Sequence, residues 1–218
     1  MSSKELLIKI EPEIFQEYDH LVKQRTYTNA NPLVRWLYWR RFKNILDLID
    51  VEERDQVLDF GCGEGAFLPT ISKIFKSVIA LDLDTRAARE TVSKFELTNV
   101  NLIEESYEKL LESNDKYDLI IAASVLEHFE ELDEVIELIN KKLKAGGQFI
   151  ASVPSENLLY RVGRKIFGFT KPEDHYQVPF QVKNALEKHF IIKKIHYGPV
   201  HLSGGFASYV IYHARKKQ

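Results

Sequence analysis

Short apolar runs alternate along the chain with longer segments in which apolar residues recur every three or four positions. The runs have the length and continuity of buried strands and cover residues 56–60, 77–82, 100–103, 117–123 and 148–153. The periodic segments between them predict helices over 66–76, 84–96 and 131–143, the last ending at Ala145-Gly146-Gly147. Strands that alternate with helices of this length predict βαβ units and a parallel sheet.

The two ends of the chain depart from this alternation. Residues 11–50 read as helical, and Asn31-Pro32 suits a helix start because the missing N–H of proline costs nothing in a first turn. After Pro154, residues 155–180 show no clear period. A helix over 181–188 and two β-rich runs, 190–197 and 206–213, complete the chain. Gly204-Gly205 lies between these runs, which predicts an antiparallel pair at the sheet edge.

The pattern predicts an α/β fold with a doubly wound, mostly parallel seven-stranded sheet and an antiparallel edge strand. The 218 residues suit one domain, 1–218, with residues 1–50 as an N-terminal helical cap.

Composition narrows the possible partners and compartments. The 30 basic and 32 acidic residues give a formal charge of -2, whereas a duplex-binding protein usually carries a basic field, so nucleic acid is an unexpected partner. Cys62 is the only cysteine, which excludes an internal disulfide and a multi-cysteine metal cage, and no metal site is expected. No apolar run approaches the length of a spanning helix, and the first residues make a poor secretory signal. A cytoplasmic protein without a transmembrane segment is expected.

One segment carries candidate chemistry, the glycine-rich turn Gly61-Cys62-Gly63-Glu64-Gly65 after the first strand. Glycine lets the backbone turn sharply and approach a ligand closely. Asp82 ends the next strand, and carboxyl ends of adjacent parallel strands form the rim where such sheets bind ligands. A carboxylate there can accept both hydroxyls of a ribose, so the pattern predicts a nucleoside ligand. Gly61, Gly63 and Ala66 also satisfy G-x-G-x-x-A, which leaves a nicotinamide dinucleotide open.

Four ordered segments resemble motifs of class I S-adenosylmethionine-dependent methyltransferases. VLDFGCGEG resembles the first motif, including the acid two residues before the first glycine, and SVIALD resembles the next. YDLIIAASVLEHFEE resembles the fourth-strand motif, and Leu126-Glu127-His128 is similar to the LEH triplet of the ubiquinone-biosynthesis-type O-methyltransferases. LKAGGQFIASVP resembles the helix–turn–fifth-strand segment, so the resemblance spans residues 57–154.

The resemblance implies S-adenosylmethionine as cofactor and assigns roles by position. Asp59 would lie near the methionine ammonium group, and the carbonyl of Ala123 could accept from the same group. The other implied cofactor residues are Gly61, Gly63 and Gly65 along the methionine part, Asp82 on the ribose and Leu83 against the adenine.

One position departs from the family pattern. Relatives often have an acid after the third strand that reads the adenine amino group, and Ser106 stands here, flanked by Glu105 and Tyr107. Either the serine oxygen accepts that hydrogen bond or Glu105 replaces it in a shifted register.

The acceptor side of the site is less determined. His128 lies just beyond the fourth strand and could act as a general base near neutral pH, or it could only pack at a helix start. Residues 155–180, with His175 and Tyr176, could form a lid over the acceptor or a solvated loop. The stretch 35–41 (RWLYWRR) could cap the cofactor, offer an arginine to its carboxylate, touch an anionic membrane or simply pack.

The resemblance implies methyl transfer from S-adenosylmethionine to a small-molecule or lipid-linked acceptor, with oxygen favoured only through the LEH triplet. An NAD-dependent oxidoreductase and a non-catalytic S-adenosylmethionine-binding module remain as alternatives. The oligomeric state and the acceptor are not predicted.

Overall fold

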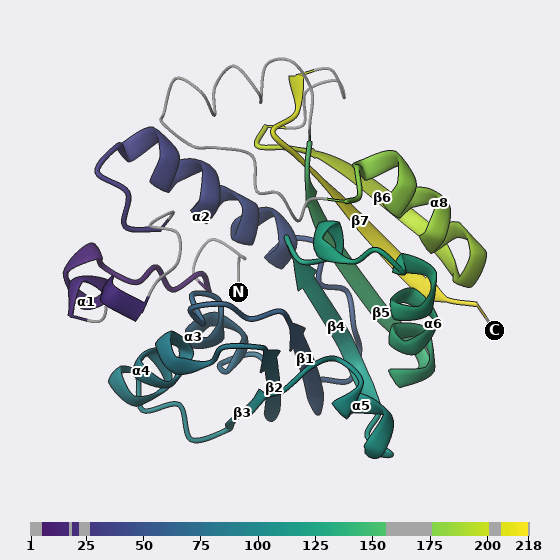
Figure 1. Ribbon diagram of the computed structural model, residues 1–218, viewed down its shortest axis with the longest axis horizontal. Coiled ribbons are helices and arrows are strands. Elements are labelled where there is room, and N and C mark those ends of the chain that lie inside the picture. The colour runs from purple at the N-terminus through teal and green to yellow at the C-terminus, as the bar shows by residue number, and fades with distance from the viewer. Residues whose placement is uncertain (1–5, 18, 22–26, 156–175, 201–205, 218) are drawn as a thin grey trace.

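A computed structural model describes residues 6–17, 19–21, 27–155, 176–200 and 206–217. Seven strands form one sheet in the order β3-β2-β1-β4-β5-β7-β6 (Figure 1). The strands are β1 Gln56–Phe60, β2 Ser77–Asp82, β3 Val100–Glu104, β4 Tyr117–Ala123, β5 Leu143–Pro154, β6 Phe190–Gly198 and β7 Tyr209–Lys216. Strands β1 to β5 pair in parallel, and β7 is antiparallel to both of its neighbours, β5 and β6.

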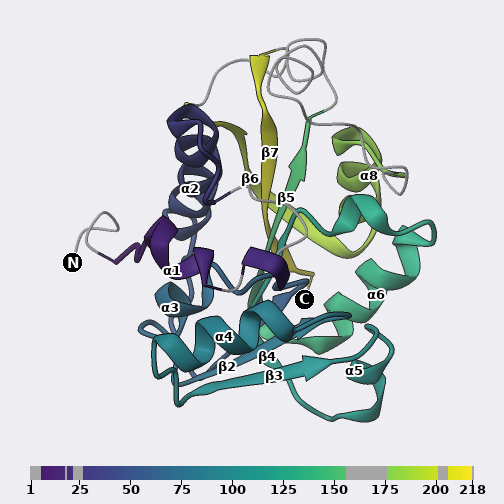
Figure 2. The ribbon, with the colours of Figure 1, turned by 60° about the vertical axis from the view of Figure 1, so that its left-hand side comes forward.

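Helices cover both faces of this sheet (Figure 2). They are α1 Pro12–Gln16, η1 Asp19–Leu21, α2 Pro32–Leu46, α3 Leu68–Ile71, α4 Arg86–Lys94, α5 Lys109–Glu112, η2 Leu126–His128, α6 Leu132–Lys142 and α8 Pro179–His189. Apolar side chains of α2, α3 and α4 pack on one face of the sheet, and those of α5, α6 and α8 pack on the other. Alternate residues of each strand serve the two cores, which explains why the central strands are apolar throughout.

The predicted parallel α/β sheet is confirmed, and so is the predicted antiparallel pairing near its edge. The antiparallel strand β7 is not itself outermost, because it lies between β5 and β6. It covers Tyr209–Lys216, so it begins and ends three residues later than the predicted run 206–213.

Two helix predictions were too long. Residues 11–50 are not one helical region, because the described part holds α1, η1 and α2 with bends between them. Within this region the start at Asn31-Pro32 is confirmed, and the Asn31 side chain accepts from Leu33 N–H. The predicted helix 66–76 is regular only in α3, because Lys73 and Ile74 N–H groups donate three residues back, to Thr70 and Ile71.

The glycines at 146 and 147 do not end α6. That helix ends at Lys142, and Leu143 already pairs with Tyr117 as the first residue of β5. The next pair is Leu119 with Gln148, so the intervening residues form an irregularity in the ladder, where Gly146 takes a φ of +71°. The pairing of Leu143 with β4 therefore decides the end of α6 before the glycines are reached.

No helix among the described residues is long and apolar enough to cross a membrane.

Candidate cofactor site

The glycine-rich turn is anchored to the end of β2. Gly61 and Cys62 N–H groups both donate to the Leu81 carbonyl, at 2.8 and 3.0 Å. Gly63 N–H donates to Oδ2 of Asp82 at 2.8 Å, and the other oxygen of that carboxylate accepts from Asp84 N–H at 3.1 Å. The turn and the acid singled out in the sequence are therefore one hydrogen-bonded unit.

Two glycines of this turn are required for different reasons. Gly61 has a φ of +77°, and a Cβ there would lie 2.5 Å from Cγ2 of Val125. Gly63 has a φ of +55°, and a Cβ there would meet no atom within 4 Å. Gly61 is therefore needed because the Val125 side chain leaves no room for a Cβ. Gly63 borders open space in which a ligand has room.

Asp59 lies at the buried side of the turn. It is 3% exposed, and burial, helped by the negative charge of Asp82 and opposed by Arg41, raises its pKa to about 7. Glu64 has a similar environment: burial raises its pKa to about 8, Arg41 opposes the shift, and Asp82 adds to it. The site therefore holds three neighbouring carboxyl groups and one guanidinium, which suits a ligand with a positive group.

Arg41 of α2 supplies that guanidinium from a buried position, with 8% of the residue exposed. One terminal nitrogen donates to Tyr27 Oη at 2.8 Å, and the other donates to Oγ of Ser124. Burial alone would lower the pKa of Arg41, but Tyr27, Tyr38 and Glu127 outweigh it and raise the pKa. A charged arginine thus joins the N-terminal helix to the end of β4.

The backbone after β4 turns sharply beside this arginine. Ser124 has a φ of +60°, a backbone conformation that residues other than glycine rarely adopt. Its N–H donates to the Ser152 carbonyl at 2.8 Å. Such strained residues concentrate at functional sites. The turn leads into η2, where His128 is half-buried and Glu127 is 1% exposed.

The residues predicted for the adenine lie on the opposite side of the turn. Leu83, directly after β2, is 74% exposed. Ser106 is exposed and hydrogen-bonds to Glu108, whose pKa this bond lowers. Tyr107 is half-buried and packs edge-to-face on Phe129, with ring centroids 5.3 Å apart.

The strand order brings the predicted residues together along one rim. Because β3, β2, β1 and β4 are neighbours, their carboxyl ends place the following groups side by side: Ser106 and Tyr107, then Asp82 and Leu83, then Asp59 and the glycines, then Ala123 and His128. The roles of the individual residues remain predictions.

The sequence named Arg41 only as one of three arginines in the stretch 35–41 that could reach the cofactor carboxylate, and it indicated no role for Tyr27, Ser124 or Glu64. A signal for Arg41 was available, since it falls in line with Val34, Tyr38 and Ile45 at steps of four, three and four residues. An arginine within a buried helical stripe needs polar partners, which points to a site. Leu33, an apolar residue of the same helix, is 54% exposed.

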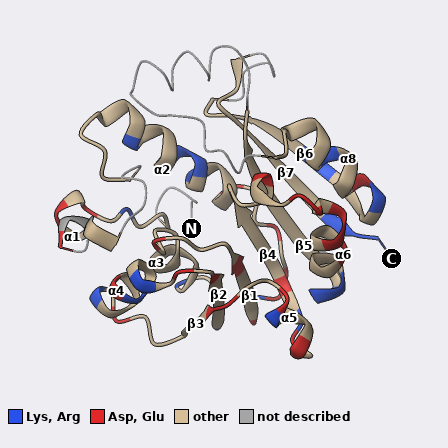
Figure 3. Ribbon diagram, viewed as in Figure 1, with Lys and Arg blue, Asp and Glu red and all other residues tan. Residues whose placement is uncertain are grey.

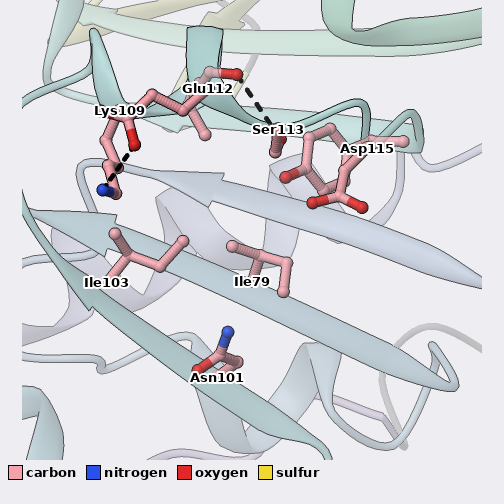
Figure 4. A pocket seen from close by; sticks show the side chains of 9 residues that line it. Ile79, Asn101, Ile103, Lys109, Glu112, Ser113 and Asp115 are labelled. Atoms are coloured by element: carbon pink, nitrogen blue, oxygen red, sulfur yellow. Dashed lines mark hydrogen bonds and ion pairs between the residues drawn. The ribbon is translucent and has the colours of Figure 1, made fainter.

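A cavity of about 290 Å³ between α5 and strands β2 and β3 is separate from this rim (Figure 4). Ile79 and Ile103 form its floor, and Lys109 and Glu112 come from α5 and pair at 2.7 Å. Ile79 pairs with Asn101, three residues before the Asp82–Glu104 pair, so the cavity lies about 10 Å below the carboxyl ends.

The predicted lid over residues 155–180, with His175 and Tyr176, lies largely outside the described part of the chain. His175 and most of the predicted lid 155–180 are not described, whereas Tyr176 and Gln177 N–H groups donate to the Glu127 carbonyl at 2.8 and 3.2 Å. Among the described residues, no group of three or more His, Cys, Asp or Glu side chains could hold a metal ion.

The raised pKa of Asp59 predicts a pH-dependent affinity. A cationic group bound beside Asp59 stabilises its ionised form, so S-adenosylmethionine affinity is expected to rise from pH 5.5 to 7.5, by up to about tenfold per pH unit. Titration calorimetry in two buffers of different ionisation enthalpy measures the released proton. Asp59→Asn is expected to reduce this slope, leaving the contribution of Glu64, and an unchanged slope would contradict the assignment.

The raised pKa of Asp59 affects stability in the opposite direction from ligand affinity: stability falls as the pH rises. The folded protein holds the Asp59 proton more tightly than the unfolded chain does, so this group's contribution to the free energy of unfolding falls from about pH 4 to 7.

Comparisons with known proteins agree with this architecture. A family model described as a methyltransferase domain matches residues 32–189, more than half of the chain. The N-methyltransferase NodS of Bradyrhizobium japonicum WM9, solved with S-adenosyl-L-homocysteine, is 17% identical with a TM-score of 0.64, over 94% of this chain and 99% of that chain. The sheet is thus the Rossmann-like fold of class I methyltransferases.

The curated sequence relatives match over a smaller part of the chain. The ubiquinone biosynthesis O-methyltransferase of Chelativorans sp. is 27% identical over 123 residues, 52% of this chain and 45% of the relative. A 23S rRNA (uracil(1939)-C(5))-methyltransferase RlmD of Francisella tularensis subsp. novicida is 29% identical over 111 residues, 47% of this chain and 25% of the relative. The matches span about half or less of the length of these curated relatives. By its family match, the chain belongs to the methyltransferase-domain family.

Proposed function

We propose that this protein transfers a methyl group from S-adenosylmethionine to a small-molecule or lipid-linked acceptor. The observation that carries the proposal is the single unit formed by the glycine turn, Asp82 and the buried Asp59 at the rim of a methyltransferase-family sheet. The residues fit the cofactor, because open space adjoins Gly63 and three carboxyl groups adjoin a place for its positive charges. S-adenosylmethionine supplies an activated methyl group on a sulfonium centre.

Each predicted residue has a binding role in this proposal. Asp59 holds the methionine ammonium, with help from the Ala123 carbonyl, and Asp82 accepts from the ribose hydroxyls. The exposed apolar side chain of Leu83 covers the adenine, and Ser106 and Tyr107 border its far edge. Residues 1–50 act as a cap on this site, which the buried contact of Arg41 with Ser124 supports.

Arg41 binds the methionine carboxylate in this proposal. Its guanidinium is charged, buried and already within the Coulomb range of Asp59 and Glu64. Replacement by methionine is expected to lower S-adenosylmethionine affinity about tenfold to a hundredfold, because a charge-assisted bidentate pair is lost.

A matched ligand separates this role from damage to the fold. The affinity of Arg41→Met for decarboxylated S-adenosylmethionine, which lacks the carboxylate, is expected to match that of the unchanged protein. Equal losses for both ligands would show that Arg41 acts only through packing.

Catalysis then depends mainly on alignment. The site must hold the acceptor in line with the methyl group and exclude water, and a base is needed only where the acceptor must lose a proton. We assign that task to His128, which lies beyond β4 in η2. His128→Ala is expected to lower turnover of a hydroxyl acceptor about a hundredfold while cofactor affinity changes less than twofold. Turnover that stays unchanged would leave His128 a structural residue.

The acceptor atom is proposed as oxygen, and this rests on the LEH triplet and on the ubiquinone biosynthesis O-methyltransferase relative. Relatives acting on carbon and neighbours acting on nitrogen share the fold, so the fold itself does not favour oxygen. The formal charge of -2 argues for a small molecule over ribosomal RNA. A cytoplasmic location is part of this proposal.

One experiment tests the proposal directly. The protein is incubated with methyl-labelled S-adenosylmethionine and a metabolite and lipid extract, and labelled products are identified by mass spectrometry. Label in a product, absent with Asp82→Ala, is the expected result. Tight cofactor binding with no labelled product would favour a non-catalytic binding module, and binding of NAD in place of S-adenosylmethionine would favour an oxidoreductase.

A further inference from the structure

Helix α2 has two unlike sides. One side packs against the sheet through Trp39, Phe42 and Ile45, which are at most 5% exposed. The other side carries Leu33, Trp36, Arg40 and Asn44, which follow one another at helical steps of three and four residues. The outer side therefore forms a continuous line along the helix.

Among the described residues, Pro199 covers this line at its C-terminal end. Arg40 Nε and Asn44 Nδ2 both donate to the Pro199 carbonyl, at 3.2 and 3.1 Å. Toward the N-terminus, Leu33 is 54% and Trp36 is 43% exposed. The helix thus presents a leucine and a tryptophan to solvent one turn apart.

Two more exposed apolar side chains adjoin the covered end. Val200 follows Pro199 and is 50% exposed, and Phe206 is 60% exposed. Ser208 N–H donates to the Gly198 carbonyl, so both residues leave the same end of the β6–β7 pair. Leu33, Trp36, Val200 and Phe206 make up what we call the α2 face.

The charge around the α2 face is positive, in a chain whose formal charge is -2. Helix α2 has four basic residues and no acidic one. Arg41 is buried and Lys43 pairs with Asp47, which leaves Arg35 and Arg40 near the surface. Lys9, Arg35 and Trp36 line a cavity of about 220 Å³, where Glu11 is the one acidic neighbour among the described residues. In Figure 3 the basic residues of α2 appear as blue bands, and the helix carries no red band.

We propose that the α2 face docks this protein on a membrane surface rich in anionic phospholipid. Tryptophan and leucine enter the boundary between headgroups and acyl chains, while arginine and lysine remain at the level of the headgroup phosphates. The positive charge of α2, in a chain of negative formal charge, favours the orientation in which this face meets the lipid. Docking here requires no spanning helix.

The position of the α2 face relates it to the cofactor site. Pro154 at the end of β5 pairs with Tyr209 at the start of β7, near the place where Phe206 leaves the sheet. The carboxyl ends of β4 and β5 therefore lie at the same end of the molecule as the α2 face (Figure 1). Membrane docking stands independently of methyl transfer, although it would bring a lipid-linked acceptor to the correct end of the sheet.

Vesicle sedimentation tests the proposal with the full chain. Wild-type protein is mixed with vesicles of phosphatidylcholine and phosphatidylglycerol in equal amounts, or of phosphatidylcholine alone. Partition to the anionic vesicles is expected to be at least about tenfold stronger and to weaken with added salt. Trp36→Ser with Phe206→Ser should reduce this partition about tenfold, and Trp36→Ser alone should reduce it less.

Leu111→Ser is the matched control, because Leu111 of α5 is 63% exposed and belongs to a helix at the other end of the sheet. It should sediment like the wild type, and all variants should keep the thermal midpoint. Equal partition to both vesicle types, or an equal loss in Leu111→Ser, would overturn the proposal. Self-association that Trp36→Ser abolishes, without vesicle binding, would overturn it in favour of a second copy of the chain.

Discussion

Replacing Asp82 by alanine is expected to lower S-adenosylmethionine affinity by about a hundredfold or more. In its proposed role Asp82 accepts two hydrogen bonds from ribose hydroxyls, and the variant would lose both, each contributing on the order of 1.5–3 kcal/mol. The Gly63 N–H also loses its acceptor at 2.8 Å, which loosens the turn that the ligand contacts. Titration calorimetry measures the affinity, and thermal unfolding shows that the domain remains folded.

Two variants separate the contributions of charge and loop anchoring. Asp82→Asn keeps an acceptor for Gly63 N–H and should retain more affinity than alanine. Asp84→Ala is the matched control, since this neighbouring carboxylate pairs at 2.8 Å with the exposed Arg86. Affinity that Asp82→Ala leaves intact, or that Asp84→Ala reduces equally, would remove the ribose assignment.

Replacing Gly61 by alanine is expected to lower the free energy of unfolding by about 3 kcal/mol. A left-handed backbone costs a residue with a Cβ about 1–2 kcal/mol, and a contact of 2.5 Å with Val125 adds overpacking of about 1–3 kcal/mol. In a chain of this length, about 6–12 °C of thermal midpoint would be lost. Denaturant and thermal unfolding followed by circular dichroism measure both quantities.

The chain offers a control with the same backbone conformation and no crowding. Gly146 has a φ of +71°, and a Cβ there would meet no atom within 4 Å, so Gly146→Ala should cost only about 1–2 kcal/mol. Combining Gly61→Ala with Val125→Ala should cost less than the sum of the two single changes. Equal costs at Gly61 and Gly146 would show that the contact with Val125 does not matter.

The parallel strands were predictable because each is a run of apolar residues that both faces of the sheet bury. The bounds of β1, β2 and β4 match the predicted runs. The bounds of the helices were less predictable, because apolar residues at steps of three to four also occur in successive turns. Such turns follow α3, where Lys73 and Ile74 N–H groups donate three residues back. The start of β5 at Leu143 depends on pairing with Tyr117, a contact that no local pattern encodes.

The candidate site divides in the same way. Gly61, Gly63 and Asp82 could be found because the required conformation and charge belong to residue types at fixed places beside strand ends. Arg41 could not be assigned in this way, since its partners Tyr27 and Ser124 stand 14 and 83 residues away. Only packing of α2 against the sheet brings that guanidinium to the end of β4.

The sequence by itself determined the parallel sheet, the turn between β1 and α3, and the acid at the end of β2. Those features follow from local burial, from backbone freedom at glycine and from the side-chain type at one position. The tertiary structure alone decided the pKa of Asp59, the position of Arg41 and the exposure of Leu33 and Trp36. Burial and electrostatic coupling depend on which distant segments meet, and these are set only when the chain folds.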